Sequence, residues 1–225
     1  MNLSIPKSEL CEYVAKQLNS FFPDKFIIKN EINNVIDLTL DRLDFCFSEV
    51  SNNRYNGIDG TIFNHLYADH YVMFLWFLSN TINKELNNLN IASKLYYLNK
   101  SLHGVDCMFD TKMPNIFLIF HGVGTMLGKA EYNDYFVVLQ GCTIGSHRGK
   151  YPIFGKGVAL TANSSVIGDC RLGDRVTVST RTTLFKKEIN NDNTAFVNFE
   201  TGQLQIKASK ECYAQQFFNI DLNTV

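Results

Sequence analysis

Apolar residues recur at every sixth position through the middle of the chain. The anchors are Phe154, Leu160, Val166, Leu172, Val178 and Leu184, and the register continues upstream through Tyr132, Val138 and Ile144. Neither the helical period of 3.6 nor the strand period of 2 produces this spacing. A second six-residue series is small or β-branched, and its members are Val158, Ser164, Cys170, Val176 and Thr182. Glycine follows several anchors directly, at positions 145, 155 and 173. The pattern predicts a hexapeptide-repeat β-helix.

In such a fold, each six-residue unit forms one flat side and a corner, and three units complete a triangular coil. The anchors point to the axis, and coils stack about 4.8 Å apart, so backbone amides pair between neighbouring coils. The register breaks where Ile144 and Phe154 lie ten residues apart. We therefore expect a loop to project from a corner at residues 146–153. Loops on rigid scaffolds often carry function.

The preceding residues have helical spacing instead. Apolar stripes predict helices at 8–22, 31–50, 61–86 and 91–102, with a polar, glycine-punctuated loop at 51–60. Helical spacing ends at Gly104, a typical C-terminal signal. We expect an α+β protein with a helical N-terminal domain (1–104), a left-handed parallel β-helix (105–189), and a C-terminal hairpin and tail (190–225). The hairpin is predicted at 197–206, turning at Thr201-Gly202.

Composition narrows the classes of function. The net charge is −1 and no basic run is present, which argues against nucleic-acid binding. Six cysteines without a C-x-x-C pair indicate reduced thiols in a cytoplasmic protein. The N-terminus lacks the features of a signal peptide. The most apolar segment, Tyr71 to Leu78, is too short to span a bilayer, so no transmembrane segment is expected.

One of the five histidines stands apart. His65, His70 and His103 lie on predicted helices or at a helix end, where packing or capping roles are expected. His121 opens a segment with three glycines in eight residues, and this clearing suits a ligand that approaches the main chain. Asp106 lies fifteen residues earlier, slightly less than one coil. The pair is either a general base with its orienting carboxylate or a buried pair that only joins two coils.

A metal site is not expected. The β-helices of the gamma carbonic anhydrases bind a metal through three histidines, two of them close in sequence. Only His121 and His147 lie in the predicted β-helix, and position 142 is cysteine.

Residues 60–185 resemble the serine acetyltransferase branch of the hexapeptide-repeat acyltransferases. The matching motifs are His121-x-x-Gly124-x-x-x-Gly128, Leu139-Gln140-x-x-Thr143-Ile144-Gly145, the loop end Tyr151-Pro152-Ile153, and Asn163-x-x-Val166-Ile167-Gly168-Asp169. The resemblance implies an O-acetyltransferase in which His121 is the base, Asp106 orients it, and the acceptor hydroxyl attacks acetyl-CoA directly.

The resemblance also implies a homotrimer, with pairing of trimers left open, and a coenzyme groove between two β-helices. The pantetheine arm would pass Ala162 and Thr180, and Lys186 and Lys187 would meet the phosphates. A backbone N–H near Gly145 and Ser146 would stabilise the oxyanion.

Two departures concern the acceptor. Serine acetyltransferases have Asp-His where this chain has Phe120-His121, and Arg-His-Pro where it has Lys150-Tyr151-Pro152. These changes remove partners for a small zwitterion and add aromatic surface, which suits a sugar. Our main hypothesis is therefore a sugar hydroxyl of a surface polysaccharide or its precursor, contacted by Phe120, His147, Lys150 and Tyr151. L-serine is the alternative acceptor, and a non-catalytic scaffold or regulatory partner is the second alternative.

Overall fold

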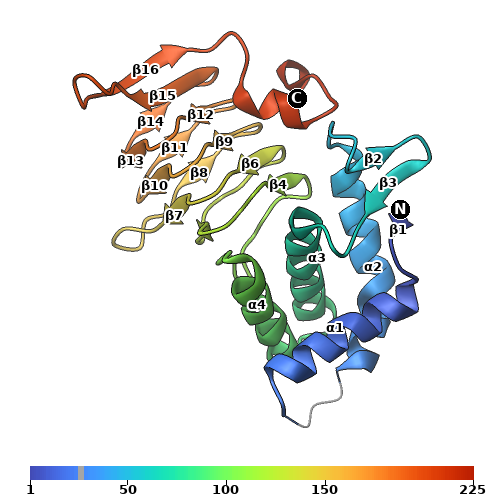
Figure 1. The fold of residues 1–225 in the computed structure, drawn as a ribbon. Helices are drawn as coiled ribbons and strands as arrows, with labels where there is room; N and C mark the ends of the chain where they lie inside the picture. Colours follow the sequence, from blue (N-terminus) through green and yellow to red (C-terminus); the bar gives the residue numbers. More distant parts are fainter. Residues whose placement is uncertain (25–27) are drawn as a thin grey trace.

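The computed structural model describes residues 1–24 and 28–225, and it contains a helical region followed by a triangular parallel β-helix (Figure 1). The helices are α1 (Lys7–Phe21), α2 (Lys29–Ser48), α3 (Ala68–Thr81), the π-helical turn η1 (Ile82–Leu86) and α4 (Leu89–His103). The predicted fold class is confirmed. The helices predicted at 8–22, 31–50 and 91–102 are confirmed to within two residues at each end.

The predicted helix at 61–86 is wrong at its beginning. Its first residues form β3 (Gly60–Phe63), which pairs with β1 (Asn2–Leu3) in parallel and with β2 (Asn56–Gly57) in antiparallel. Thr61 and Phe63 are buried while Ile62 is only partly so, which is the period of a strand rather than a helix. The helix begins at Ala68, after Tyr67 with an extended backbone. The residues expected to form a loop at 51–60 also supply β2.

The β-helix has three faces, each named here after its first strand. The β4 face contains β4 (Phe117–Ile119), β6 (Phe136–Val138), β9 (Ala159–Leu160), β12 (Thr177–Val178), β15 (Asn193–Val197) and β16 (Leu204–Ala208). The β5 face contains β5 (Met126–Leu127), β7 (Thr143–Gly145), β10 (Ser165–Ile167) and β13 (Thr183–Phe185). The β8 face contains β8 (Ile153–Phe154), β11 (Arg171–Leu172) and β14 (Glu188–Ile189).

The six-residue anchors form the core of the β-helix. On the β5 face, Ile144, Val166 and Leu184 lie in register on neighbouring strands, and all three are fully buried. Corresponding buried stacks are Val138, Leu160 and Val178 on the β4 face, and Phe154, Leu172 and Ile189 on the β8 face. The interpretation of the repeat is therefore confirmed at the level of single residues.

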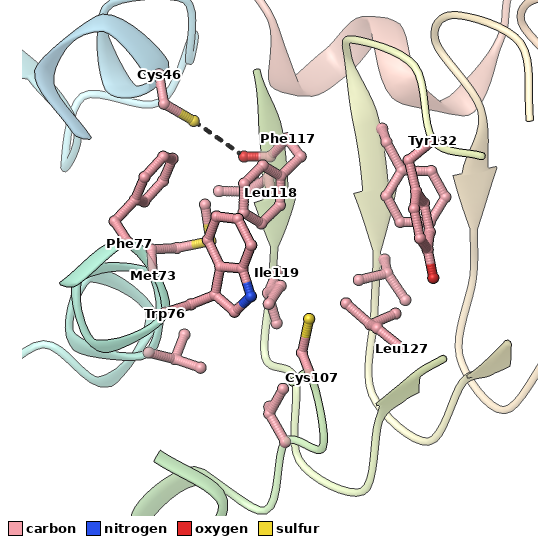
Figure 2. Packing of buried hydrophobic residues seen from close by; sticks show 14 of the residues in the cluster. Cys46, Met73, Trp76, Phe77, Cys107, Phe117, Leu118, Ile119, Leu127 and Tyr132 are labelled. Atoms are coloured by element: carbon pink, nitrogen blue, oxygen red, sulfur yellow. Dashed lines mark hydrogen bonds between the residues drawn. The ribbon is translucent and has the colours of Figure 1, made fainter. Parts of the chain in front are cut away.

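The helical region packs against the first coil of the β-helix. Figure 2 shows Trp76 and Phe77 of α3 facing Phe117 of β4, with ring centroids 5.2 and 5.5 Å from that of Phe117. The thiol of Cys46 on α2 donates a hydrogen bond to the Phe117 carbonyl at 3.2 Å. Helix α3 is buried from Asp69 to Thr81, because α2, α4 and β4 surround it.

The C-terminal residues extend the β4 face and then return to the helical region. β15 pairs with β12 in parallel, and β16 pairs with β15 in antiparallel, so the predicted hairpin is confirmed with longer strands and a turn at 198–203. The short helix η2 (Tyr213–Phe217) follows. The Ser51 N–H then donates to the Phe217 carbonyl at 2.9 Å, and the Asn219 N–H donates to the Glu49 carbonyl at 2.8 Å. Phe217 and Asn219 are thus bonded to the residues that directly follow α2.

All six cysteines are buried as free thiols. Among residues 1–24 and 28–225, none of the helices combines the length and hydrophobicity needed to cross a membrane.

Candidate active site

His121 lies at the corner between β4 and β5, and 61% of its side chain is exposed. Its φ is 53°, in the left-handed region that most residues avoid. The next residue must be glycine, because a Cβ at Gly122 would lie 2.3 Å from Cγ2 of Ile119. The Phe120 ring lies against the imidazole, with centroids 4.1 Å apart. The imidazole is therefore exposed at a corner of the β-helix, against the ring of Phe120.

A carboxylate from the helical region holds this histidine. Asp69, in the first turn of α3, accepts the His121 backbone N–H at Oδ1 (3.0 Å), and its Oδ2 lies 3.2 Å from the imidazole Nδ1. The Asp69 side chain is 8% exposed, so little water competes with His121 for this carboxylate. A proton on Nδ1 then points at Asp69, and Nε2 is left unprotonated and able to accept a proton.

Asp106 does not have the position expected from its spacing. Its carboxylate accepts hydrogen bonds from the Tyr96 hydroxyl and from Lys100 Nζ, each at 2.7 Å. Burial opposes ionisation of Asp106, but these two hydrogen bonds outweigh it and lower the pKa of the carboxyl. The backbone of Asp106 does pair with the first coil, at Met126, while the side chain is bound to α4. Asp106 is thus corrected from the partner of His121 to a contact between α4 and the β-helix.

Asp69 is supported from behind by residues of the helical region. The Tyr67 hydroxyl lies 3.4 Å from Asp69 Oδ2, and Arg54 donates to the Tyr67 oxygen at 3.3 Å. Burial raises the pKa of Asp69, while His121 and the Tyr67 hydroxyl act in the opposite direction. Burial among aromatic rings lowers the pKa of His70 to about 4, so this neighbouring imidazole is neutral near pH 7.

The expected coenzyme residues fall into separate places. Ala162 and Thr180 occupy the same corner as His121, two and three coils further on, and both line a cavity of about 390 Å³. Within the described chain, their backbone N–H groups have no backbone acceptor. Lys186 and Lys187 follow β13 and therefore lie at the next corner, across the β5 face. Gly145 and Ser146 lie at that same far edge, where β7 ends.

The expected acceptor residues are also divided. Phe120 contacts His121, as described above. Lys150 and Tyr151 line a groove of about 860 Å³ beyond the far edge of the β5 face, together with Lys129, Glu131 and Arg171. The His147 ring packs edge-on against Phe185 with centroids 5.0 Å apart, and its buried Nδ1 has no partner among the described residues. Of these expected acceptor residues, Phe120 is the one that contacts the imidazole within a single chain.

No group of three or more histidine, cysteine, aspartate or glutamate side chains in the described residues is arranged to hold an ion.

Comparisons with known proteins agree with the architecture. No family model matches the sequence, and no curated protein matches it significantly. Solved structures do match. The serine acetyltransferase of Neisseria gonorrhoeae superposes with a TM-score of 0.69 at 15% identity, covering 96% of this chain and 84% of that one. The enzyme of Vibrio cholerae O1 biovar El Tor gives 0.70 at 12% identity, covering 93% and 82%.

A serine acetyltransferase in complex with CoA gives a TM-score of 0.66 at 15% identity, with 89% of this chain and 83% of that chain covered. At these identities the likeness establishes the fold, which is the one expected from the hexapeptide pattern.

Proposed function

We propose that the protein is an acetyl-CoA-dependent O-acetyltransferase in which His121 is the general base. The observation that carries this proposal is the exposed imidazole whose Nδ1 is bound by the buried Asp69 carboxylate. The acceptor hydroxyl gives its proton to Nε2 while its oxygen attacks the thioester carbonyl. The tetrahedral intermediate then expels the thiolate of coenzyme A, which takes the proton from the imidazolium. The solved CoA complex with the same fold supports this choice of donor.

We further propose that the active site is completed by a second copy of the chain in a trimer. The outward residues of the β5 face carry no charge, and they are Met126, Gly128, Thr143, Gly145, Ser165, Ile167, Thr183 and Phe185. One edge of this face carries His121, and the other carries the loop with Lys150 and Tyr151. Cyclic symmetry joins unlike edges of neighbouring copies. It would therefore bring the loop of one protomer, with the N–H groups near Gly145 and Ser146, to the imidazole of the next.

L-serine is the acceptor best supported by the comparisons. The matching structures are serine acetyltransferases, and the Neisseria gonorrhoeae enzyme is also solved in complex with serine at a TM-score of 0.69. In this chain, Lys150 is the candidate partner for the serine carboxylate, in place of the arginine expected from the resemblance.

A sugar hydroxyl is the second candidate, favoured by a different observation. Phe120 lies directly against His121, and Tyr151 lies half exposed in a groove of about 860 Å³, far larger than serine needs. Aromatic faces of this kind stack on the C–H faces of sugars, and the surrounding charged side chains hydrogen-bond hydroxyl groups.

Release of free thiol from acetyl-CoA tests the proposed acetyltransferase activity and the choice of acceptor. Purified protein is incubated with L-serine or with a panel of sugars and oligosaccharides, beside the variant His121→Ala. We expect thiol release with one acceptor class and a loss of at least about 10² in kcat/KM in the variant, the usual scale of general-base catalysis. A folded trimer without thiol release for any acceptor would instead support the non-catalytic scaffold.

A further inference from the structure

The expected coenzyme residues lie at two different corners of the β-helix, so the cation that binds the phosphates of coenzyme A has to be identified from the structure. Ala162 and Thr180 share a corner with His121, whereas Lys186 and Lys187 lie at the next corner. Lys186 is placed over the Phe185 ring, 5.0 Å from its centroid, on the β5 face. On the His121 side of the chain, the lysine that lines the groove past Ala162 and Thr180 is Lys207 of β16.

This groove continues from the β-helix onto the C-terminal hairpin. The cavity of about 390 Å³ beside Ala162 adjoins a second cavity of about 480 Å³. The two share Ser179, Thr180, Thr194 and Lys207. The second cavity ends at Phe196 and Phe199, at the end of β15 and in the turn of the hairpin. Figure 1 shows this hairpin extending from the end of the β-helix that lies furthest from the helices.

The length of the groove matches the length of the donor coenzyme. From the coil of His121 to that of Phe199 there are four steps of about 4.8 Å, or roughly 19 Å in total. The phosphopantetheine arm has about 13 bonds between sulfur and phosphorus, and it extends about 15 Å at roughly 1.2 Å per bond. With the thioester at His121, the first phosphate reaches the coil of Thr180. The adenosine then falls on the next coil, which is the hairpin.

The residues at that end have the chemistry that a nucleotide needs. Phe199 is 79% exposed, although large aromatic side chains are usually buried. Lys207 Nζ lies 5.2 Å from the centroid of the Phe196 ring, where the groove passes from one cavity to the other. Glu211 and Glu200 line one cavity each, so the phosphates are expected between them, at Lys207. Exposed aromatic rings bind bases by stacking, and lysine binds phosphate as a point charge.

We propose that the hairpin formed by β15 and β16 is the nucleotide subsite of the donor coenzyme. Phe199 stacks on the adenine and Lys207 pairs with the phosphates, in place of Lys186 and Lys187. This inference rests on the proposed acetyl-CoA-dependent function, and it assigns the nucleotide end of the donor to a segment outside the hexapeptide repeat.

Calorimetric titration of the full-length protein tests the subsite. The ligands are coenzyme A and pantetheine, which lacks the nucleotide. The variants are Phe199→Ala and Lys207→Ala, with Lys187→Ala as the matched control at the other corner. We expect each hairpin variant to bind coenzyme A about tenfold more weakly and pantetheine unchanged, and the control to bind both as the wild type does. Phe199→Tyr and Lys207→Arg are expected to retain most of the affinity.

Three results would overturn the proposal. The first is wild-type affinity for coenzyme A in both hairpin variants, and the second is a loss confined to Lys187→Ala. If the wild type still releases thiol from acetyl-CoA in either case, only the subsite fails and the acetyltransferase function stands. The third is a wild type that neither binds coenzyme A nor releases thiol, and it removes both. Phe199 and Lys207 are exposed, so unchanged thermal unfolding of the variants separates loss of binding from loss of fold.

Discussion

The β-helix and the helical region build their interiors in different ways. In the β-helix, each coil buries the same type of residue at the same place, as with Ile144, Val166 and Leu184, and its strands pair with those of the neighbouring coils. In the helical region, each contact occurs once and does not repeat along the chain. For example, Arg42 on α2 donates hydrogen bonds to Asn80 and Thr81 on α3. The candidate dyad takes its imidazole from the first region and its carboxylate from the second. The scaffold is therefore modular, while the candidate dyad depends on how the two regions dock.

The largest expected effect comes from removing an anchor of the β-helix. Phe154 is fully buried and lies against Tyr132 and Phe136, with ring centroids 5.4 Å away in each case. Phe154→Ala leaves a cavity and is expected to cost about 3–5 kcal/mol of unfolding free energy. Chemical denaturation measures this, with the exposed Phe45→Ala on α2 as the control, expected to cost under about 1 kcal/mol. Similar costs in both variants would show that the buried anchors of the β-helix do not contribute more to stability than exposed residues do.

Removing the carboxylate tests the docking of the two regions. Asp69→Ala takes away the group that holds the Nδ1 proton and orients the ring, so we expect a loss of about 10² in kcat/KM, equal to about 2.7 kcal/mol. Asp106→Ala is the matched control, because its carboxylate is bound to Tyr96 and Lys100, and it is expected to lose less than tenfold. A larger loss from Asp106→Ala than from Asp69→Ala would reverse the assignment of the dyad.

Acid is expected to weaken the helical region before the β-helix. Burial lowers the pKa of His70 on α3 and His103 on α4 to about 4, against about 6.5 in the unfolded chain. Between these values the unfolded state binds more protons, so stability is complete above pH 6.5 and falls as the pH drops toward 4. Each histidine contributes at most about 1.4 kcal/mol per pH unit.

Hydrogen exchange at pH 7 and pH 5 should locate this loss in α3 and α4. Replacing His103 by asparagine should reduce the slope of stability against pH by roughly half. Equal loss of protection in β9 to β13 would contradict the comparison of the two regions.

The smallest effect concerns the residues behind Asp69. Tyr67→Phe removes a hydroxyl that favours the ionised carboxylate, so the pKa of Asp69, already raised by burial, is expected to rise further. Activity then falls at a higher pH than in the wild type as the solution is acidified, with a loss of about threefold near neutrality. The pH profile of kcat/KM measures this shift. A uniform loss without a shift would indicate a purely structural role for Tyr67.

The same contrast explains how much the sequence could predict. Ile144, Val166 and Leu184 could be placed because a repeat fixes the direction of each side chain locally. The error at Thr61 to Phe63 arose because pairing with β1, distant in the chain, and with β2, directly before it, selected a strand. The spacing put Asp106 slightly less than one coil before His121, but Tyr96 and Lys100 decide where its carboxylate lies. Asp69 is 52 residues from His121 on another element, and no spacing rule connects them.

The coenzyme and acceptor residues show a related limit. A six-residue register gives the coil and the face of a side chain, so Ala162 and Thr180 were expected at one groove. The same register says nothing of which corner a neighbouring copy covers. For this reason Lys186 and Lys187 were grouped with Ala162, although the β5 face separates them. Phe199 and Lys207 lie past the repeat, where the register no longer applies.

The return of the C-terminal residues to the helices has a mechanical consequence. A β-helix that contacted the helical region only through its first coil would be free to bend at its last coil. Here the Phe217 carbonyl accepts a hydrogen bond from the Ser51 N–H, and the Phe217 ring lies 5.3 Å from that of Phe120. The C-terminal residues therefore connect the last coil to the helical region and to the first coil. The two ends of the β-helix are thus linked, and a displacement of the hairpin can be transmitted through Phe217 to the Phe120 ring beside His121.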